Sequence, residues 1–330
     1  MIITRTPFRI SFCGGGTDMP SHYKKNGGCV ISTAIDKYVY ITIARSFHRN
    51  LTMLKYSTME TVDDLDFIRH PIFREVLQKY NMIGTEINST SNIPSGTGLG
   101  SSSTFSVGLI NAVRTMKKLP VTAQILAEEA CDIEINRLGG PIGKQDQYAA
   151  AYGGLNFIRF NEDDSVDIEP INLSAEEKKE LSDSLMMFYL GGTRNASKFL
   201  KKYNDDTPEL TSKKNELSKL TLKLKDELNE GNLDYMGRAL NEGWKVKKTL
   251  SNGVSNDIID DVYDTAINNG AAGGKLLGAG GNGFMLFYVE KRNQNSVRDA
   301  LSAYREMYFN LEETGSKVML NDDNLTDLKR

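Results

Sequence analysis

The sequence predicts an α+β protein of two domains, on three observations. Apolar and polar residues alternate at residues 8–12 and 39–43, which is the pattern of β-strands with one buried face. Leucines at helical spacing dominate residues 210–228. Apolar runs at residues 184–190 and 284–289 would give those helices a sheet, without the regular alternation of strand and helix that a parallel sheet requires.

The length of the chain supports the division into two domains. A chain of 330 residues with 39% hydrophobic residues can fill two ordinary cores. We expect the boundary near residues 170–185, so that residues 1–175 form the N-terminal domain and residues 176–330 the C-terminal domain.

The first predicted helix follows a glycine-rich loop at residues 94–103. A strand should end at residues 85–87, ahead of this loop. The helix after the loop should be buried, because its residues are mostly apolar, namely Phe105, Val107, Leu109, Ile110 and Val113.

A second helix should begin after Pro120, with Thr122 near its cap, and end at the glycine pair 139–140. Glu134 then lies in its last turns. A strand pair is expected around residues 153–160, followed by an acidic turn at residues 161–164 and by a capping box formed by Ser174 and Glu177.

Two apolar stripes at helical spacing predict core-facing helices in the C-terminal domain. The lysine-rich segment 213–225 is expected to be a solvated helix face. The first stripe closes at Gly231 and the second at Gly270, and the stripes consist of Leu210, Leu217, Leu220, Leu224 and Leu228, and of Ile258, Ile259, Val262, Tyr263 and Ile267.

Composition excludes several classes of protein. A net charge of −3 gives no reason to expect nucleic acid or an anionic membrane as a partner. The cysteines Cys13, Cys29 and Cys131 are sparse and lack metal-site spacing, which favours a reduced, cytoplasmic compartment. We recognise no signal peptide, and the longest clean apolar run, six residues at 284–289, is far below the ~20 that span a bilayer.

The loop at residues 94–103 is suited to hold phosphate. Its glycines allow the backbone to approach a ligand closely, and its serines supply donors where the helix begins. The loop has no lysine and is therefore not a P-loop. A match to the dinucleotide pattern at residues 278–283 precedes a strand instead of following one, so we discount it.

Three motifs resemble those of the GHMP kinases, a family named for galactokinase, homoserine kinase, mevalonate kinase and phosphomevalonate kinase. The central one is Pro-x-x-x-Gly-Leu-Gly-Ser-Ser at residues 94–102, and the outer two lie at residues 6–18 and 275–283. Their joint order makes chance a poor explanation. The resemblance implies an S5-like N-terminal domain, a ferredoxin-like C-terminal domain and an active site between them. It also implies ATP binding by Pro94, Gly96, Gly98, Leu99, Gly100, Ser101, Ser102 and Ser103.

Phosphoryl transfer needs a divalent metal and a group that orients the acceptor hydroxyl. Ser102 and Glu134 could supply oxygen ligands to Mg²⁺, although an N-cap serine and a surface glutamate would look the same. Glu134 and Asp146 are 12 residues apart, the separation seen in galactokinase-like members between the metal glutamate and the active-site aspartate.

The segment Gln-Asp-Gln around Asp146 resembles the one that carries the catalytic aspartate in sugar-phosphorylating members. The family resemblance implies that Asp146 accepts the proton of the sugar hydroxyl or orients that hydroxyl. Lys144 or Arg9 would lower its pKa and stabilise charge on the phosphoryl group. Homoserine kinase works without such a base, so both roles of Asp146 remain open.

The motif Gly-Gly-Gly-Thr-Asp at residues 14–18 is the expected sugar site. Gly15 and Gly16 permit close approach of a ligand, Thr17 follows them, and the carboxylate of Asp18 can accept two hydrogen bonds from a polyol. Galactokinases have Gly-Glu-His before Thr-Asp, which argues against galactose. The form found here resembles the branch that acts on heptose 7-phosphate and fucose-like sugars at the anomeric carbon.

Further segments resemble the D-glycero-D-manno-heptose 7-phosphate kinases of that branch, among them residues 55–57, 69–75 and 191–194. Their activity would convert the sugar phosphate to the 1,7-bisphosphate, on the route to GDP-heptose for surface polysaccharide. Thr193 and Arg194 could bind the phosphate already on the sugar, and the resemblance adds Gly280 and Gly281 to the substrate pocket. Alternatives are a fucokinase or another sugar-1-kinase, or an inactive sugar sensor of the same fold.

Overall fold

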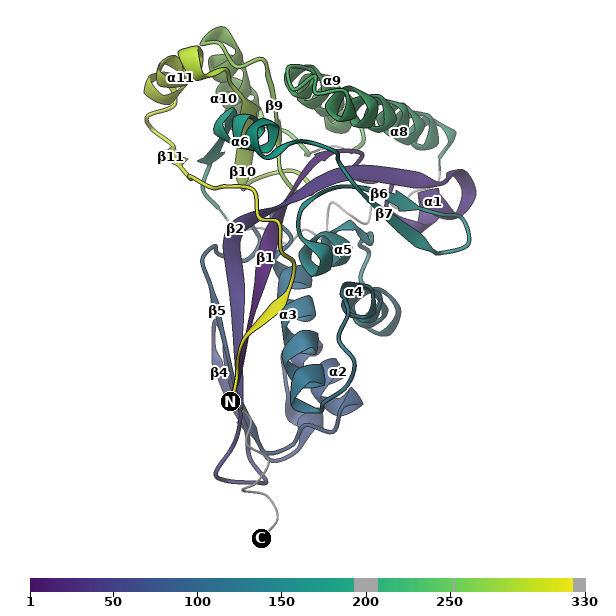
Figure 1. The fold of residues 1–330 in the computed structure, drawn as a ribbon, viewed down its shortest axis with the longest axis vertical. Helices are drawn as coiled ribbons and strands as arrows, with labels where there is room; N and C mark the ends of the chain where they lie inside the picture. Colours follow the sequence, from purple (N-terminus) through teal and green to yellow (C-terminus); the bar gives the residue numbers. More distant parts are fainter. Residues whose placement is uncertain (193–206, 252, 323–330) are drawn as a thin grey trace.

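The structure is a computed structural model that describes residues 1–192, 207–251 and 253–322. It contains two β-sheets, one large and one small, with helices from both halves of the chain around them (Figure 1). Thr193 and Arg194, the expected phosphate-binding residues, lie outside the described residues.

The large sheet has eight strands in the order β12-β1-β2-β5-β3-β4, with β6 paired to β2 and β7 paired to β6. Its pairs are antiparallel except for β3 with β5. The strands are β1 (Ile2–Cys13), β2 (Gly28–Arg45), β3 (Thr52–Lys55), β4 (Met59–Val62), β5 (Thr85–Ser91), β6 (Leu155–Phe160), β7 (Val166–Pro170) and β12 (Lys317–Asn321).

β1 and β2 pair along most of their length. β2 also pairs with β6 at its start and with β5 at its end, so this long strand connects the two parts of the large sheet. The prediction of one buried face is confirmed for residues 39–43, where buried and half-buried residues alternate. It is wrong for residues 8–12, because Arg9 and Ser11 are buried as well. Helices from both halves of the chain contact β1, so neither of its faces is open to solvent.

The helices of the N-terminal half pack beside the large sheet (Figure 1). The predicted cap at Thr122 is confirmed, since its side chain accepts a hydrogen bond from Ile125 N at 3.2 Å. The last turns of that helix are a π-helical segment, Asp132–Arg137, which contains Glu134. The α-helices are α1 (Pro20–Asn26), α2 (Pro71–Lys79), α3 (Ser101–Met116), α4 (Ala123–Cys131) and α5 (Gln145–Tyr152), and a 3-10 turn spans Leu65–Phe67.

The small sheet is antiparallel, in the order β11-β8-β10-β9, and confirms the strands expected at residues 184–190 and 284–289. The capping box of Ser174 and Glu177 is present at the start of α6. The strands are β8 (Leu185–Tyr189), β9 (Gly273–Leu276), β10 (Phe284–Tyr288) and β11 (Arg305–Glu306), and the helices are α6 (Ala175–Asp183), α8 (Pro208–Asn229), α9 (Tyr235–Lys248), α10 (Asp257–Asn268) and α11 (Gln294–Ala300), with a 3-10 turn at Lys291–Asn293.

Two details of the predicted helix faces are wrong. Ile258 is 58% exposed, because it lies one residue before Ile259, which begins the buried stripe of α10, and is therefore rotated about 100° away from it. Lys214, in the lysine-rich segment expected to be solvated, is buried.

The small sheet joins two hydrophobic cores. Met187 on β8 and Leu286 on β10 belong to the core of the large sheet, whereas Met186 and Phe287, which are their neighbours in sequence, belong to a second core with α10. This is the alternation of faces expected for β-strands. The predicted domain boundary at residue 175 falls at the first residue of α6, and β12 returns from the second half of the chain to pair with β1.

Candidate active site

A cavity of about 980 Å³ lies where the three glycine-rich segments meet. A Cβ atom on Gly98 would lie 2.5 Å from the carbonyl oxygen of Leu277, and one on Gly283 would lie 2.4 Å from that of Thr97. Residues 94–103, the expected phosphate loop, therefore pack directly against residues 277–283, and a side chain at either glycine would separate the two segments.

The phosphate loop opens α3 with Gly100 as its N-cap, in the left-handed conformation at φ 79°. No side chain among the described residues caps this helix, so the N–H groups of its first turn are available to an anion. The predicted cradle residues that line the cavity are Pro94, Gly96, Gly98, Gly100, Ser101, Ser102 and Ser103. Leu99 is buried outside the cavity lining, and its carbonyl oxygen accepts a hydrogen bond from Arg9 N.

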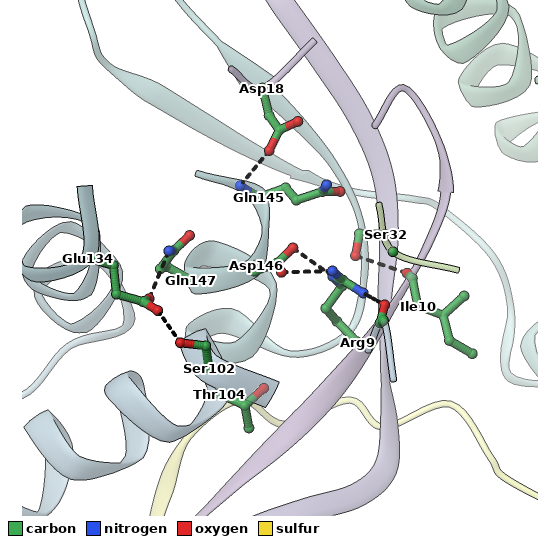
Figure 2. Close-up of polar contacts among 12 residues, drawn as sticks. Arg9, Ile10, Asp18, Ser32, Ser102, Thr104, Glu134, Gln145, Asp146 and Gln147 are labelled. Atoms are coloured by element: carbon green, nitrogen blue, oxygen red, sulfur yellow. Dashed lines mark hydrogen bonds and ion pairs between the residues drawn. The ribbon is translucent and has the colours of Figure 1, made fainter. Parts of the chain in front are cut away.

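Arg9 and Asp146 form a bidentate ion pair at the cavity wall (Figure 2). Arg9 Nε donates to Asp146 Oδ1 at 2.8 Å, and Arg9 Nη2 donates to Asp146 Oδ2 at 2.7 Å. The third nitrogen, Nη1, donates to the carbonyl oxygen of Gly98 at 2.8 Å, so one guanidinium connects the carboxylate to the phosphate loop. A Cβ atom on Gly100 would lie 3.3 Å from Asp146 Oδ2.

Lys144, the other cation expected beside Asp146, is placed elsewhere. Its Nζ donates to the carboxylate and to the carbonyl oxygen of Asp164, both at 2.8 Å. Asp164 lies in the turn between β6 and β7, where it also binds Lys24 at 2.9 Å and Tyr23 at 2.5 Å. These contacts hold the pKa of Asp164 well below its usual range.

Glu134 and Ser102 meet as predicted for a metal site (Figure 2). Ser102 Oγ donates to Glu134 Oε1 at 2.7 Å, and Gln147 Nε2 donates to Glu134 Oε2 at 2.9 Å. Glu134 is 4% exposed, and burial raises its pKa despite these hydrogen bonds. Both donors are neutral, so the described contacts leave the charge of this carboxylate uncompensated.

Asp18 is buried at the cavity and is held by backbone donors. Gly16 N donates to its Oδ1 at 2.9 Å and Gln145 N to its Oδ2 at 3.3 Å. Burial raises the pKa of Asp18. A Cβ atom on Gly143 would lie 1.9 Å from Asp18 Oδ2, so the segment that begins α5 packs tightly on this carboxylate.

The other predicted substrate residues divide into two groups. Gly15 and Gly16 line the cavity, whereas the hydroxyl of Thr17 donates to the carbonyl oxygen of Cys29 at 2.9 Å and so stabilises the fold. Gly280 and Gly281 are absent from the cavity lining and pack on Val254.

Two cavity lysines were not predicted to have a functional role. Lys275 is buried and donates to the carbonyl oxygens of Ser11 and Phe12 at 2.7 and 2.9 Å, and burial lowers its pKa to about 8. Lys247 Nζ donates to the carbonyl oxygens of Leu276 and Gly278. The position of Lys275 in the third motif could have identified it as a residue of the site. Lys247 lies among other lysines of an amphipathic helix, so no feature of the sequence distinguishes it.

Comparison with known proteins agrees with this arrangement. Residues 67–154 match the family model of the GHMP kinases N terminal domain, and residues 224–310 match that of the GHMP kinases C terminal. D-glycero-alpha-D-manno-heptose 7-phosphate kinase of Campylobacter jejuni is 30% identical over 91% of this chain and 93% of its own.

Solved structures share the fold over nearly the whole chain. A D-glycero-D-manno-heptose 1-phosphate kinase from Bacteroides thetaiotaomicron superposes with a TM-score of 0.79 at 24% identity, covering 97% of this chain and 99% of its own. A sugar kinase described as putative, from Campylobacter jejuni, gives a TM-score of 0.77 at 28% identity, covering 96% and 97%. Among the described residues, no helix is both long and apolar enough to span a lipid bilayer.

Proposed function

This chain belongs to the GHMP kinase family and is an ATP-dependent sugar kinase, and we propose that it phosphorylates the anomeric hydroxyl of D-glycero-D-manno-heptose 7-phosphate. The product would be the 1,7-bisphosphate, a precursor of GDP-heptose for surface polysaccharide. The reaction would take place in the cytoplasm. The observation that carries the proposal is the Arg9–Asp146 ion pair beside the phosphate loop.

The phosphate loop would hold ATP. The uncapped first turn of α3 offers backbone N–H groups and a helix dipole to the phosphates, and Ser101 to Ser103 add hydroxyls. A Cβ atom on Gly100 of that loop would lie 3.3 Å from Asp146 Oδ2, so an acceptor hydroxyl on Asp146 would lie beside the phosphates of a bound ATP.

Asp146 would orient the acceptor hydroxyl and receive its proton. The bidentate contact from Arg9 fixes the direction of the carboxylate. The same guanidinium can stabilise negative charge on the phosphoryl group during transfer, as cations do in other phosphotransferases. Lys144 is committed to Asp164, so we assign the charge-stabilising role to Arg9 alone.

The residues at Glu134 fit a Mg²⁺ ion. A buried carboxylate with neutral donors and a raised pKa gains from a cation, and Ser102 Oγ lies beside it. Groups of three or more His, Cys, Asp or Glu side chains that could hold a metal do not occur among the described residues, so such an ion would complete its shell with phosphate and water. When bound, Mg²⁺ would neutralise charge on the phosphates.

The identity of the sugar rests on the Campylobacter relative and on the motif at residues 14–18. Asp18 supports a polyol substrate, because its buried carboxylate faces the cavity and can accept from hydroxyl groups. We propose that Thr193 and Arg194 bind the phosphate that the substrate already carries.

An ADP-release assay over sugars and sugar phosphates tests the proposal. We expect heptose 7-phosphate to give the highest kcat/KM, and phosphorus NMR to show the new phosphate coupled to the anomeric proton. A higher value for L-fucose would replace the assignment with a fucokinase. Stoichiometric sugar binding without ADP release would indicate a sensor.

A further inference from the structure

Two residues at the cavity carry buried polar atoms without a hydrogen-bond partner among the described residues. They are the hydroxyl of Ser11 and the amide oxygen of Gln145. Ser11 is 6% exposed. A buried polar atom without a partner is destabilising, and such atoms are few in native structures.

In contrast to Ser11, the neighbouring hydroxyl residues on β2 have hydrogen-bond partners. Ser32 is paired with Ser11 across β1 and β2, and its hydroxyl donates to the carbonyl oxygen of Ile10 at 3.0 Å (Figure 2). Thr33, the next residue, also forms a hydrogen bond through its side chain. Hydroxyl groups at Ser32 and Thr33 therefore find acceptors within the protein, whereas that of Ser11 has none among the described residues.

Gly15 lies between the two side chains. A Cβ atom on Gly15 would be 3.7 Å from Ser11 Oγ and 3.7 Å from Gln145 Nε2. Gly15 is not among the glycines with positive φ, so its backbone would accept a side chain. The lack of a side chain at position 15 keeps the space between the hydroxyl and the amide open.

We propose that Ser11, Gly15 and Gln145 form a subsite that recognises one hydroxyl group of the sugar. A sugar hydroxyl is both a donor and an acceptor, so it can accept from Gln145 Nε2 and donate to Ser11 Oγ, the two atoms that lie 3.7 Å from the Cβ position of Gly15. This inference rests on the proposed function, because it assigns these residues to the sugar acceptor and not to ATP.

The surroundings of the subsite are rigid and adjacent to the reacting group. Lys275 Nζ fixes the carbonyl oxygen of Ser11 at 2.7 Å. The backbone N–H of Gln145 donates to Asp18, and Asp146 is the next residue in the chain. A hydroxyl held here would fix the orientation of the sugar relative to Asp146.

The first test is Ser11→Ala. The KM for the sugar should rise roughly 3- to 10-fold, the effect of one hydrogen bond, while the KM for ATP stays constant. The melting temperature should stay the same or rise, because the variant removes an unsatisfied hydroxyl. A merely structural serine would instead lower the melting temperature and leave the sugar KM unchanged.

Ser182→Ala is the matched control. Ser182 on α6 also has a buried hydroxyl without a partner among the described residues, and it does not line the cavity. Its replacement should affect the melting temperature in the same direction and should leave the sugar KM at the wild-type value. An equal rise of the sugar KM in both variants would overturn the proposal.

Gly15→Ala tests the open space without removing a polar group. The added methyl meets only ordinary contacts in the free protein, so the variant should fold normally and bind ATP normally. Its sugar KM should rise at least about tenfold, because the methyl occupies the position of the sugar hydroxyl. An unchanged sugar KM would overturn the proposal.

Deoxy sugars identify the hydroxyl that is recognised. For one deoxy analogue of the best substrate, Ser11→Ala should have no further effect on KM, as in a double-mutant cycle. If the KM of the best substrate itself, with all its hydroxyl groups, is unchanged by both Ser11→Ala and Gly15→Ala, the subsite is refuted and the kinase assignment stands. If calorimetry detects no binding of any sugar or sugar phosphate in the panel, both the subsite and the proposed function fail.

Discussion

Asp146 accepts two hydrogen bonds from Arg9, and we propose that it orients the acceptor hydroxyl. Asp146→Ala should lower kcat by about 10²- to 10⁴-fold, the usual effect of losing a positioned acid or base, while ATP binding remains close to normal. Steady-state kinetics and nucleotide calorimetry measure the two effects. The exposed Asp63 provides the control, since Asp63→Ala should leave both quantities unchanged. Near-normal turnover of Asp146→Ala would remove Asp146 from the mechanism.

We expect the Glu134 carboxylate to lower the stability of the metal-free protein and to increase its affinity for Mg²⁺. Glu134→Gln replaces a buried, uncompensated carboxylate with a neutral amide, so the metal-free variant should melt at a higher temperature near neutral pH. The Mg²⁺ concentration for half-maximal activity should rise, because one oxygen ligand is weakened. Thermal shift and a Mg²⁺ titration give both values. A Mg²⁺ titration identical to wild type would show that Glu134 is not a ligand.

The buried amine of Lys275 should make the free energy of unfolding depend on pH in the alkaline range. Its pKa is about 8 in the folded protein and about 10.5 in the unfolded chain, so the unfolded chain binds more protons between these values. Stability relative to Lys275→Met should therefore rise with pH across this window, by an amount on the order of a few kcal/mol. Urea unfolding from pH 8 to pH 10.5 measures the difference. A difference that stays constant would show that the ammonium titrates normally.

At the scale of residues, sequence patterns identified the charged side chains of the candidate site, but they did not identify all of the residues to which these side chains bind. Arg9, Asp146 and Ser102 belong to motifs and line the cavity, and Glu134, identified by its spacing to Asp146, accepts a hydrogen bond from Ser102. Lys144 belongs to a motif too, yet its partner Asp164 is 20 residues away in an ordinary acidic turn. Such a contact depends on tertiary packing, and no local pattern encodes it.

The turn between β6 and β7 is an element that supports the site from a distance. Asp164 contacts Lys144, which precedes α5, the helix that carries Asp146, and Lys24 on α1, the helix that follows residues 14–18. Asp164→Asn should lower kcat a few-fold, in line with the modest strength of partly exposed ion pairs. Asp163→Asn, in the same turn, should have no effect on kcat. Equal kcat values for the wild type, Asp164→Asn and Asp163→Asn would show that the contact between Asp164 and Lys144 does not position Asp146.

Elements were predictable where a local signal fixed their ends. The cap at Thr122, the capping box at Ser174 and the strand at residues 284–288 follow from side-chain chemistry and periodicity. The burial of both faces of residues 8–12 was not predictable, because it depends on helices that arrive from the second half of the chain. The π-helical segment at Glu134 likewise has no sequence signal that we recognise.

The whole molecule should unfold as one unit despite its two cores. Alternate residues of β8 and β10 belong to different cores, so neither core can melt without exposing the small sheet. The single tryptophan, Trp244, lies in the second core and reports on it by fluorescence, whereas far-UV circular dichroism reports on all elements. We expect coincident midpoints in urea. Separate midpoints would show that the cores are independent.

The ordinary backbone at Gly15 has an evolutionary consequence. Arg9 is held in the middle of β1 and Asp146 on α5, while position 15 lies in the loop beyond the strand. A methyl group acquired at position 15 would enter the proposed sugar pocket at ordinary contact distances and without backbone strain. Under the proposed subsite, single substitutions at position 15 would change which sugar is preferred while the Arg9–Asp146 pair stays in place.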